Sequence, residues 1–163
     1  MSLKTPSSSL EPSVEISAPK PFEAIDRGNF AVMEKQISVE EIERFALLSG
    51  DFNPLHLDAA FAQQTQFARP VAHGMLVGSY VSTLIGMRLP GPGALWTQQT
   101  FRWLHPVFAG DVIRVVLRVV HKSPGSRMLK VEVEASNQDG IRILDGAGLV
   151  MMVEKQASPA TAS

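Results

Sequence analysis

The chain has 163 residues, of which 45% are hydrophobic and 19% charged, and these values are typical of one globular domain large enough to bury a core. Fifteen basic and sixteen acidic residues give a net charge of −1 without a basic cluster, which argues against nucleic acid or an anionic membrane as a partner. The absence of cysteine excludes disulfides, thiolate metal sites and a cysteine nucleophile.

The start of the chain does not have the pattern of a secretory signal. The first 30 residues contain no continuous apolar stretch, and the longest apolar run, residues 75–87, is too short to span a bilayer. We therefore expect a soluble, cytoplasmic protein. Prolines and serines dominate residues 1–21, which predicts a disordered or loosely attached arm ahead of a folded domain at 22–153. Residues 154–163 are expected to form a flexible tail.

The first half of the domain has helix signals after one expected strand at residues 30–37. Ser38 and Glu41 form a capping box, and Gly50 supplies the stop signal of the helix that follows. Asp58 is placed to cap a second, short helix that runs to about residue 64. Residues 74–88 are apolar on every side and predict a buried helix, which the Pro-Gly-Pro-Gly run after it would end.

The second half of the domain alternates apolar and polar residues with a period of two. This pattern predicts four β-strands, at residues 94–103, 111–122, 128–137 and 141–153, with turn signals between the last three. Half-buried antiparallel strands need one covering layer, and the apolar helix is the candidate. The expected class is an α+β fold in which the sheet wraps around that helix.

A polar turn at residues 49–56, with the sequence SGDFNPLH, contains an acid and a base five residues apart. Asn53 and Pro54 lie between Asp51 and His56 and indicate a turn, not the interior of a helix. A carboxylate beside an imidazole is the combination needed for proton transfer. The same spacing also fits a structural Asx-turn in which Asp51 binds backbone amides, and spacing alone leaves both readings open.

Two metal-binding readings of this region are weaker. A calcium-binding EF-hand loop starting at Asp51 would need glycine where His56 stands and glutamate where Ala62 stands. A site built on His56, Asp58 and His73 lacks the usual spacing of histidine ligands, so we expect no metal.

Gly74 lies at the expected mouth of the apolar helix, where backbone N–H groups are unpaired and the helix dipole is positive. Because glycine has no side chain, a substrate carbonyl could approach its N–H as in an oxyanion hole. Gly78, Ser82 and Ile85 follow on the same helical stripe. Gly78 would leave room, Ser82 would add a hydroxyl, and Ile85 would limit the depth of a pocket along this stripe. Helix packing would use the same small residues.

Three ordered motifs resemble one known family. Residues 45–56 (FALLSGDFNPLH), with Ala62 six positions further on, are similar to the hydratase 2 signature. Residues 69–75 (RPVAHGM) and 106–111 (PVFAGD) are similar to two further hallmarks of the MaoC-like dehydratases, which include the R-specific enoyl-CoA hydratases. The resemblance extends over about residues 30–153.

This resemblance implies a hot-dog fold, a homodimer, and reversible hydration of trans-2-enoyl thioesters, with CoA as the expected carrier, to (R)-3-hydroxyacyl thioesters. It implies no metal or redox cofactor. Asp51 and His56 would hold the water, with Asn53 orienting them. The Gly74 N–H would bind the thioester oxygen, and Ser82 would support the site. Two rival functions are a hot-dog acyl-thioesterase and a non-catalytic acyl-binding subunit. The second is disfavoured because both members of the acid–base pair are present.

Overall fold

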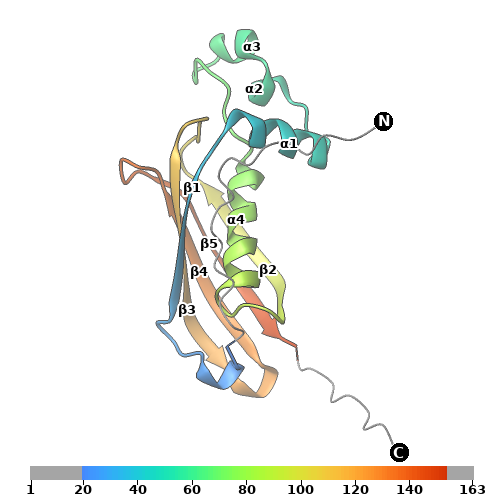
Figure 1. Cartoon of the computed structure of the whole chain (residues 1–163). Helices are drawn as coiled ribbons and strands as arrows, with labels where there is room; N and C mark the ends of the chain where they lie inside the picture. Colours follow the sequence, from blue (N-terminus) through green and yellow to red (C-terminus); the bar gives the residue numbers. More distant parts are fainter. Residues whose placement is uncertain (1–19, 154–163) are drawn as a thin grey trace, which may run out of the picture.

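The computed structural model describes residues 20–153, which form an antiparallel sheet curved around one long helix (Figure 1). The expected terminal arm and tail lie almost wholly outside the described residues. In spatial order the five strands are β1, β3, β4, β5 and β2, so β1 and β2 are the two edges. Their bounds are Phe30–Gln36 for β1, Ala94–Trp103 for β2, Val112–Ser123 for β3, Met128–Ser136 for β4 and Arg142–Met152 for β5. The predicted α+β hot-dog class is confirmed.

The sheet forms because its strands alternate between a face that packs on the helix and a face that meets solvent. In β3 and β4 the inward residues are at most 3% exposed; they are Ile113, Val115, Leu117, Val119, Leu129, Val131, Val133 and Ala135. These are the residues whose alternation the sequence shows. A short 3-10 turn, η2 (Pro124–Ser126), joins the two strands, and another, η1 (Phe22–Ala24), places Phe22 against the core.

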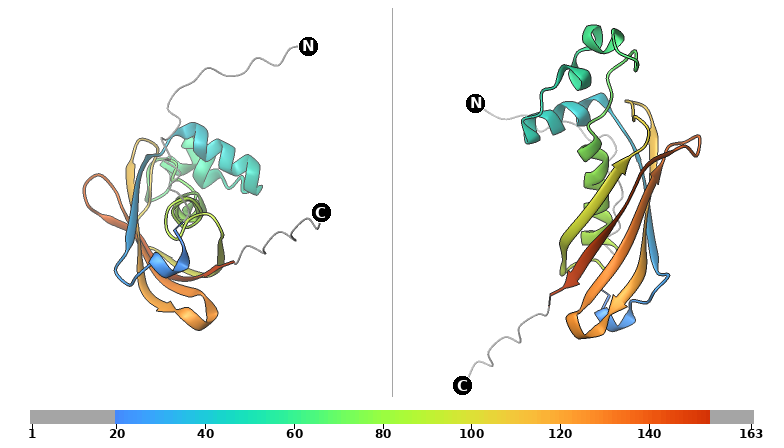
Figure 2. Two further views of the ribbon diagram at one scale, coloured as in Figure 1. Left: turned by 60° about the horizontal axis from the view of Figure 1, so that its bottom comes forward. Right: turned by 180° about the vertical axis from the view of Figure 1, so that it is seen from behind.

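The central helix α4 (Gly74–Met87) begins and ends within a residue of its expected bounds. In the left view of Figure 2, which looks nearly along its axis, it lies inside the curve of the sheet. It buries Leu76, Val77, Val81, Leu84 and Ile85. The expectation that α4 is enclosed on every side is wrong for this chain. Met75, Ser79 and Ser82 form an exposed stripe, because a five-stranded sheet covers only part of a helix's circumference.

Three short helices gather at one end of the sheet, and two of them, α2 and α3, project beyond it (Figure 1). Helix α1 (Val39–Ser49) has the predicted capping box at Ser38, and Gly50 ends it in the left-handed conformation, with φ of 78°. Helix α3 (Ala59–Gln63) is capped by Asp58, as predicted. Between them lies α2 (Pro54–Leu57), so the reading of this stretch as a turn is wrong for its second half. Proline fits the first position of a helix, where its missing N–H would be unpaired anyway.

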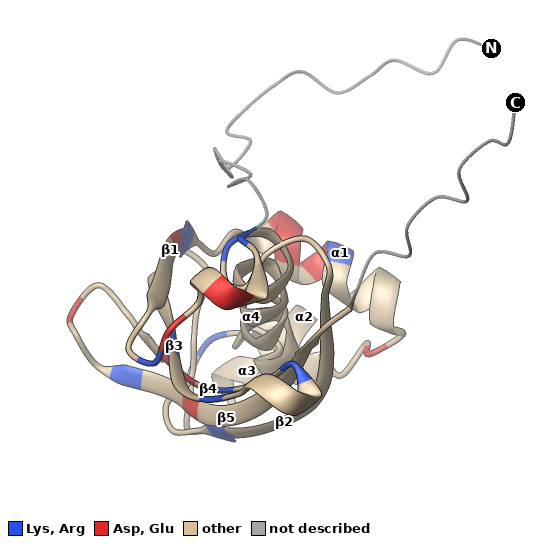
Figure 3. Cartoon of the chain, turned by 90° about the horizontal axis from the view of Figure 1, so that it is seen from below, with Lys and Arg blue, Asp and Glu red and all other residues tan. Residues whose placement is uncertain are grey.

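Charged residues of both signs are interspersed over the end of the molecule that Figure 3 shows. Among the described residues, no helix is both long and apolar enough to cross a membrane.

Candidate active site

The connection between α1 and α2 holds Asp51 by local hydrogen bonds. Asp51 Oδ1 accepts the Asn53 N–H at 3.2 Å, and Asn53 Oδ1 accepts the Leu55 N–H at 3.1 Å as the cap of α2. The Asx-turn anticipated from sequence is therefore present, but it uses only one carboxylate oxygen. The other, Oδ2, lies 4.0 Å from His73 Nε2, and about half of the Asp51 side chain is exposed. The carboxylate therefore has a structural oxygen and one that faces the site.

His56 is oriented by a backbone group far away in sequence. Its Nδ1 lies 2.7 Å from the carbonyl oxygen of Val71. A carbonyl can only accept, so Nδ1 carries the proton and Nε2 keeps its lone pair in the neutral ring. The Val71 N–H in turn donates to the Leu55 carbonyl at 3.2 Å, which ties α2 to the segment before α4. This arrangement leaves His56 Nε2 as the basic atom.

His73 is the site residue that sequence reasoning considered only as a metal ligand. It is 2% exposed, its ring lies 3.9 Å from the His56 ring between centroids, and its Nε2 lies 3.0 Å from the Asp51 carbonyl oxygen. The available signal was its place between the apolar pair Val71-Ala72 and Gly74, where a polar residue is unexpected. Asp58, its proposed partner as a ligand, is used instead to cap α3.

Donor atoms of Asp51, His56 and His73 lie within 4.8 Å of one another, close enough to hold a metal ion. Each histidine gives one ring nitrogen to a backbone carbonyl, as histidine ligands of metals also do, so this contact does not discriminate. The ring geometry favours a proton-transfer pair, because the two ring planes are inclined by only 34° with their centroids 3.9 Å apart. Ring lone pairs lie in the ring planes, so stacked rings direct them side by side and not toward one tetrahedral centre.

Gly74 is the first residue of α4, immediately after His73. In the first turn of a helix the N–H groups have no partner within the helix. A side chain at Gly74 would place its Cβ 2.6 Å from Trp103 Nε1, so only glycine fits beside that indole. A groove of about 560 Å³ opens here; Gly74, Val77, Trp103, Leu104 and Ile143 are among the residues that line it. An unpaired N–H and an apolar groove therefore meet at one place.

The remaining residues predicted for the site are placed apart from this groove. Gly78 is covered by Phe101, whose ring would lie 3.2 Å from an added Cβ. Ile85 is 2% exposed within the core, and Ser82 lies on the exposed stripe of α4. None of the three lines the groove. Their roles stay predictions.

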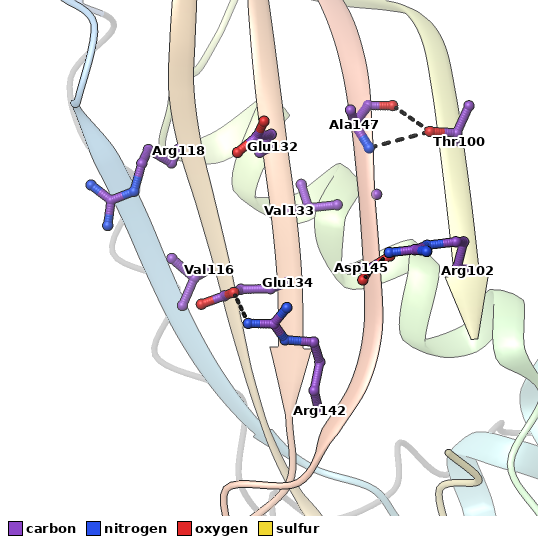
Figure 4. Close-up of a pocket in the computed structure, with 11 residues that line it drawn as sticks. Thr100, Arg102, Val116, Arg118, Glu132, Val133, Glu134, Arg142, Asp145 and Ala147 are labelled. Carbon is purple, nitrogen blue, oxygen red and sulfur yellow. Dashed lines mark hydrogen bonds and ion pairs between the residues drawn. The ribbon is translucent and has the colours of Figure 1, made fainter. Parts of the chain in front are cut away.

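A second hollow, of about 500 Å³, lies on the outer face of the sheet, the face turned away from α4 (Figure 4). Four of its charged side chains form two ion pairs. Arg102 donates two hydrogen bonds to Asp145, at 2.8 and 2.7 Å, and Arg142 lies 3.1 Å from Glu134. The hydrogen bonds from Arg102 hold the pKa of the Asp145 carboxyl below its ordinary value. This hollow has the character of a solvated, ion-paired sheet face.

The structure is a hot-dog fold with a carboxylate and an imidazole beside the mouth of its central helix, and comparison with known proteins assigns the family. Residues 22–140 match the MaoC-like domain, and the chain belongs to that family.

Two characterised relatives match most of both chains. A 3-hydroxybutyryl-CoA dehydratase of Methylorubrum extorquens is 36% identical over 135 residues, which is 83% of this chain and 85% of the relative. An (R)-specific enoyl-CoA hydratase of Aeromonas caviae is 35% identical over 130 residues, 80% of this chain and 97% of the relative.

Solved structures agree with these sequence matches. The (R)-hydratase from A. caviae superposes with a TM-score of 0.78 at 35% identity, covering 80% of this chain and 99% of that one. An R-hydratase from Pseudomonas aeruginosa gives 0.77 at 36% identity, covering 88% and 96%.

Proposed function

We propose that this protein catalyses the reversible hydration of trans-2-enoyl-CoA thioesters to (R)-3-hydroxyacyl-CoA thioesters. The observation that carries the proposal is the meeting of Asp51, His56 and Gly74: an acid–base pair beside a helix mouth that opens onto an apolar groove. Relatives named as hydratases and dehydratases of CoA thioesters, at 34–36% identity, support the same activity. No feature of the site favours a thioesterase.

The chemistry follows from which atoms are free. One water is held between the Asp51 carboxylate and His56 Nε2, and its oxygen adds to C3 of the enoyl group. The dyad takes the proton that the water loses and delivers a proton to C2 on the same face, so it returns to its starting state. Negative charge develops on the thioester oxygen, where the Gly74 N–H stabilises it. Asp51 and His56 act as one coupled unit, since the proton belongs to the pair.

The other predicted residues have supporting roles in this proposal. Asn53 holds the Asp51 carboxylate through its backbone N–H and starts the helix that carries His56. The acyl chain enters the groove beside Gly74 and Val77. For a longer chain to pass Gly78 and reach Ile85, the Phe101 ring that covers Gly78 has to move aside. Neither a metal nor a redox cofactor takes part in this mechanism.

The test is to incubate the purified protein with crotonyl-CoA. Hydration is expected to remove the absorbance of the conjugated double bond without releasing free thiol, and chiral analysis is expected to give the (R)-3-hydroxy product. Release of free thiol would identify a thioesterase, and no change in the substrate would indicate a binding subunit.

We also propose a homodimer. Strand β2 is an unpaired edge, and large apolar side chains are exposed along it, on α4 and on the α1–α2 segment; they are Leu95, Trp103, Met75, Leu47, Leu48 and Phe52. A second protomer pairing with this edge would cover much of this surface. Sedimentation at micromolar concentration is expected to give a dimer, and a fully active monomer would contradict the proposal.

A further inference from the structure

His73 is the one polar or charged residue that is fully buried within residues 20–153. Two buried side-chain polar atoms in this part of the chain have no hydrogen-bond partner, and His73 Nδ1 is one of them. The other is the hydroxyl of Tyr80, also on the α4 side of the core. A buried polar atom without a hydrogen-bond partner destabilises the folded state, because it loses its hydrogen bonds to water. An apolar side chain of similar size would avoid this cost, so stability alone does not account for an imidazole here.

The contacts of His73 explain better why an imidazole occupies this position. Its Nε2 donates to the Asp51 carbonyl at 3.0 Å, while its ring stacks on His56 at 3.9 Å and packs with Phe45 at 5.1 Å. Its own backbone caps α4 immediately before Gly74. One side chain thus contacts both members of the acid–base pair, and it is covalently joined to the residue at the helix mouth.

We propose that His73 is a positioning residue that fixes Asp51 and His56 relative to each other and to Gly74. The inference rests on the proposed hydratase function. Because Nε2 donates to a backbone carbonyl, the hydrogen bond sets the orientation of the Asp51 backbone, from which its carboxylate projects. The His73 ring also lies against the face of the His56 ring and so fixes the plane of that ring. His73 does not line the groove, so it acts on the geometry of the dyad and not on substrate binding.

Three substitutions separate positioning from packing. The amide nitrogen of His73→Gln can reach the position of Nε2 and restore the donor to Asp51. The shorter amide of His73→Asn corresponds to Nδ1 and cannot. His73→Met fills the space without a donor. We expect kcat to fall about 10- to 100-fold for His73→Asn and His73→Met, as is typical when reacting groups are misplaced by about 1 Å. His73→Gln is expected to recover most of this loss, and KM for crotonyl-CoA is expected to change little in all three.

Thermal unfolding of each variant identifies those that remain folded at the assay temperature. Equal kcat for the Gln, Asn and Met variants, or a wild-type kcat in His73→Met, would overturn the positioning role. An inactive wild-type protein would instead overturn the proposed function, and this inference with it.

A measurement on the wild-type protein covers the case in which the variants do not fold. Nitrogen-15 NMR of histidine-labelled protein is expected to show His73 as the tautomer protonated at Nε2, with an N–H that exchanges slowly with solvent. A tautomer protonated at Nδ1 would mean that the hydrogen bond to Asp51 is absent, and it would refute the proposal.

Discussion

The dyad corner, made of Asp51, His56, His73 and Gly74, differs from the hollow on the outer face of the sheet in how its polar groups are satisfied. In the outer hollow, Arg102 binds Asp145 through two hydrogen bonds, so both charges are paired. At the dyad corner, backbone carbonyls and N–H groups hold the side chains, and each side chain is left with an atom that is not engaged by another charge.

The difference explains why similar residue types serve separate purposes. A carboxylate paired with a guanidinium is kept ionised and occupied. A histidine whose one nitrogen is tied to a carbonyl is oriented, yet its other nitrogen can still exchange a proton. The number of charged side chains around a hollow is therefore a poor guide to catalytic function. A better guide is whether each side chain is bound by another charge or by a backbone group.

The largest expected effect tests the dyad itself. Asp51→Asn and His56→Ala are each expected to lower kcat about 100- to 10,000-fold, the usual cost of removing a positioned acid or base. Thermal unfolding should remain cooperative, because Asp51 is half exposed and His56 only partly buried. The matched control is Asp145→Asn, the same change in the outer hollow, which should leave kcat unaltered. If Asp51→Asn kept wild-type turnover, the comparison would fail.

A second prediction concerns how far the acyl chain reaches along α4. Ile85→Ala is expected to raise turnover of longer enoyl-CoAs relative to crotonyl-CoA, because it opens space at the end of the proposed path. Leu84→Ala is the matched control: both residues are at most 2% exposed, and each truncation should cost about 2–5 kcal/mol of unfolding free energy. Only Ile85→Ala should change the ranking of enoyl-CoA substrates by turnover. The same order in both variants would place Ile85 in the core alone.

A third prediction tests whether the close packing of strands β2 and β5 beside the outer hollow requires glycine at position 146. Gly146 borders it, and an added Cβ would lie 1.9 Å from the backbone oxygen of Thr100. Gly146→Ala should therefore force β2 away from β5 and cost about 1–3 kcal/mol. A Cβ added at Gly86 would meet no atom within 4 Å apart from its chain neighbours and the backbone of its own helix, so Gly86→Ala should instead stabilise α4 by about 0.5–1 kcal/mol. Urea unfolding measures both, and a neutral Gly146→Ala would show that the strands can adjust.

The smallest expected effect is a pH dependence that belongs to the outer hollow. Hydrogen bonding to Arg102 lowers the folded-state pKa of Asp145 below its unfolded value of about 3.9. Its contribution to stability is then complete above that unfolded value and is lost as the pH falls through the folded pKa. Wild-type protein should exceed Asp145→Asn in urea midpoint at about pH 6, and the difference should disappear in strong acid. A difference that grows on acidification would contradict the pairing.

The sequence alone determined the strands, helices α1, α3 and α4, and their approximate bounds. Alternation in residues 112–123 and 128–136 reports which side of a strand is buried, and this local property survives in the tertiary structure. The capping box at Ser38 and the left-handed Gly50 set the bounds of α1 through contacts of a few residues. Asp51 and His56 were identifiable because they belong to one short, recognisable motif.

Other features depended on contacts between distant parts of the chain. Whether α4 is fully enclosed depends on how far the sheet curves around it, and no local pattern in residues 74–87 contains that information. His56 is oriented by Val71, fifteen residues away, and His73 reaches back twenty-two residues to Asp51. The indole of Trp103, the last residue of edge strand β2, lies against Gly74, the first residue of α4. Local sequence specifies which way a residue faces along its own element, but the docking of one element on another decides which atom it meets.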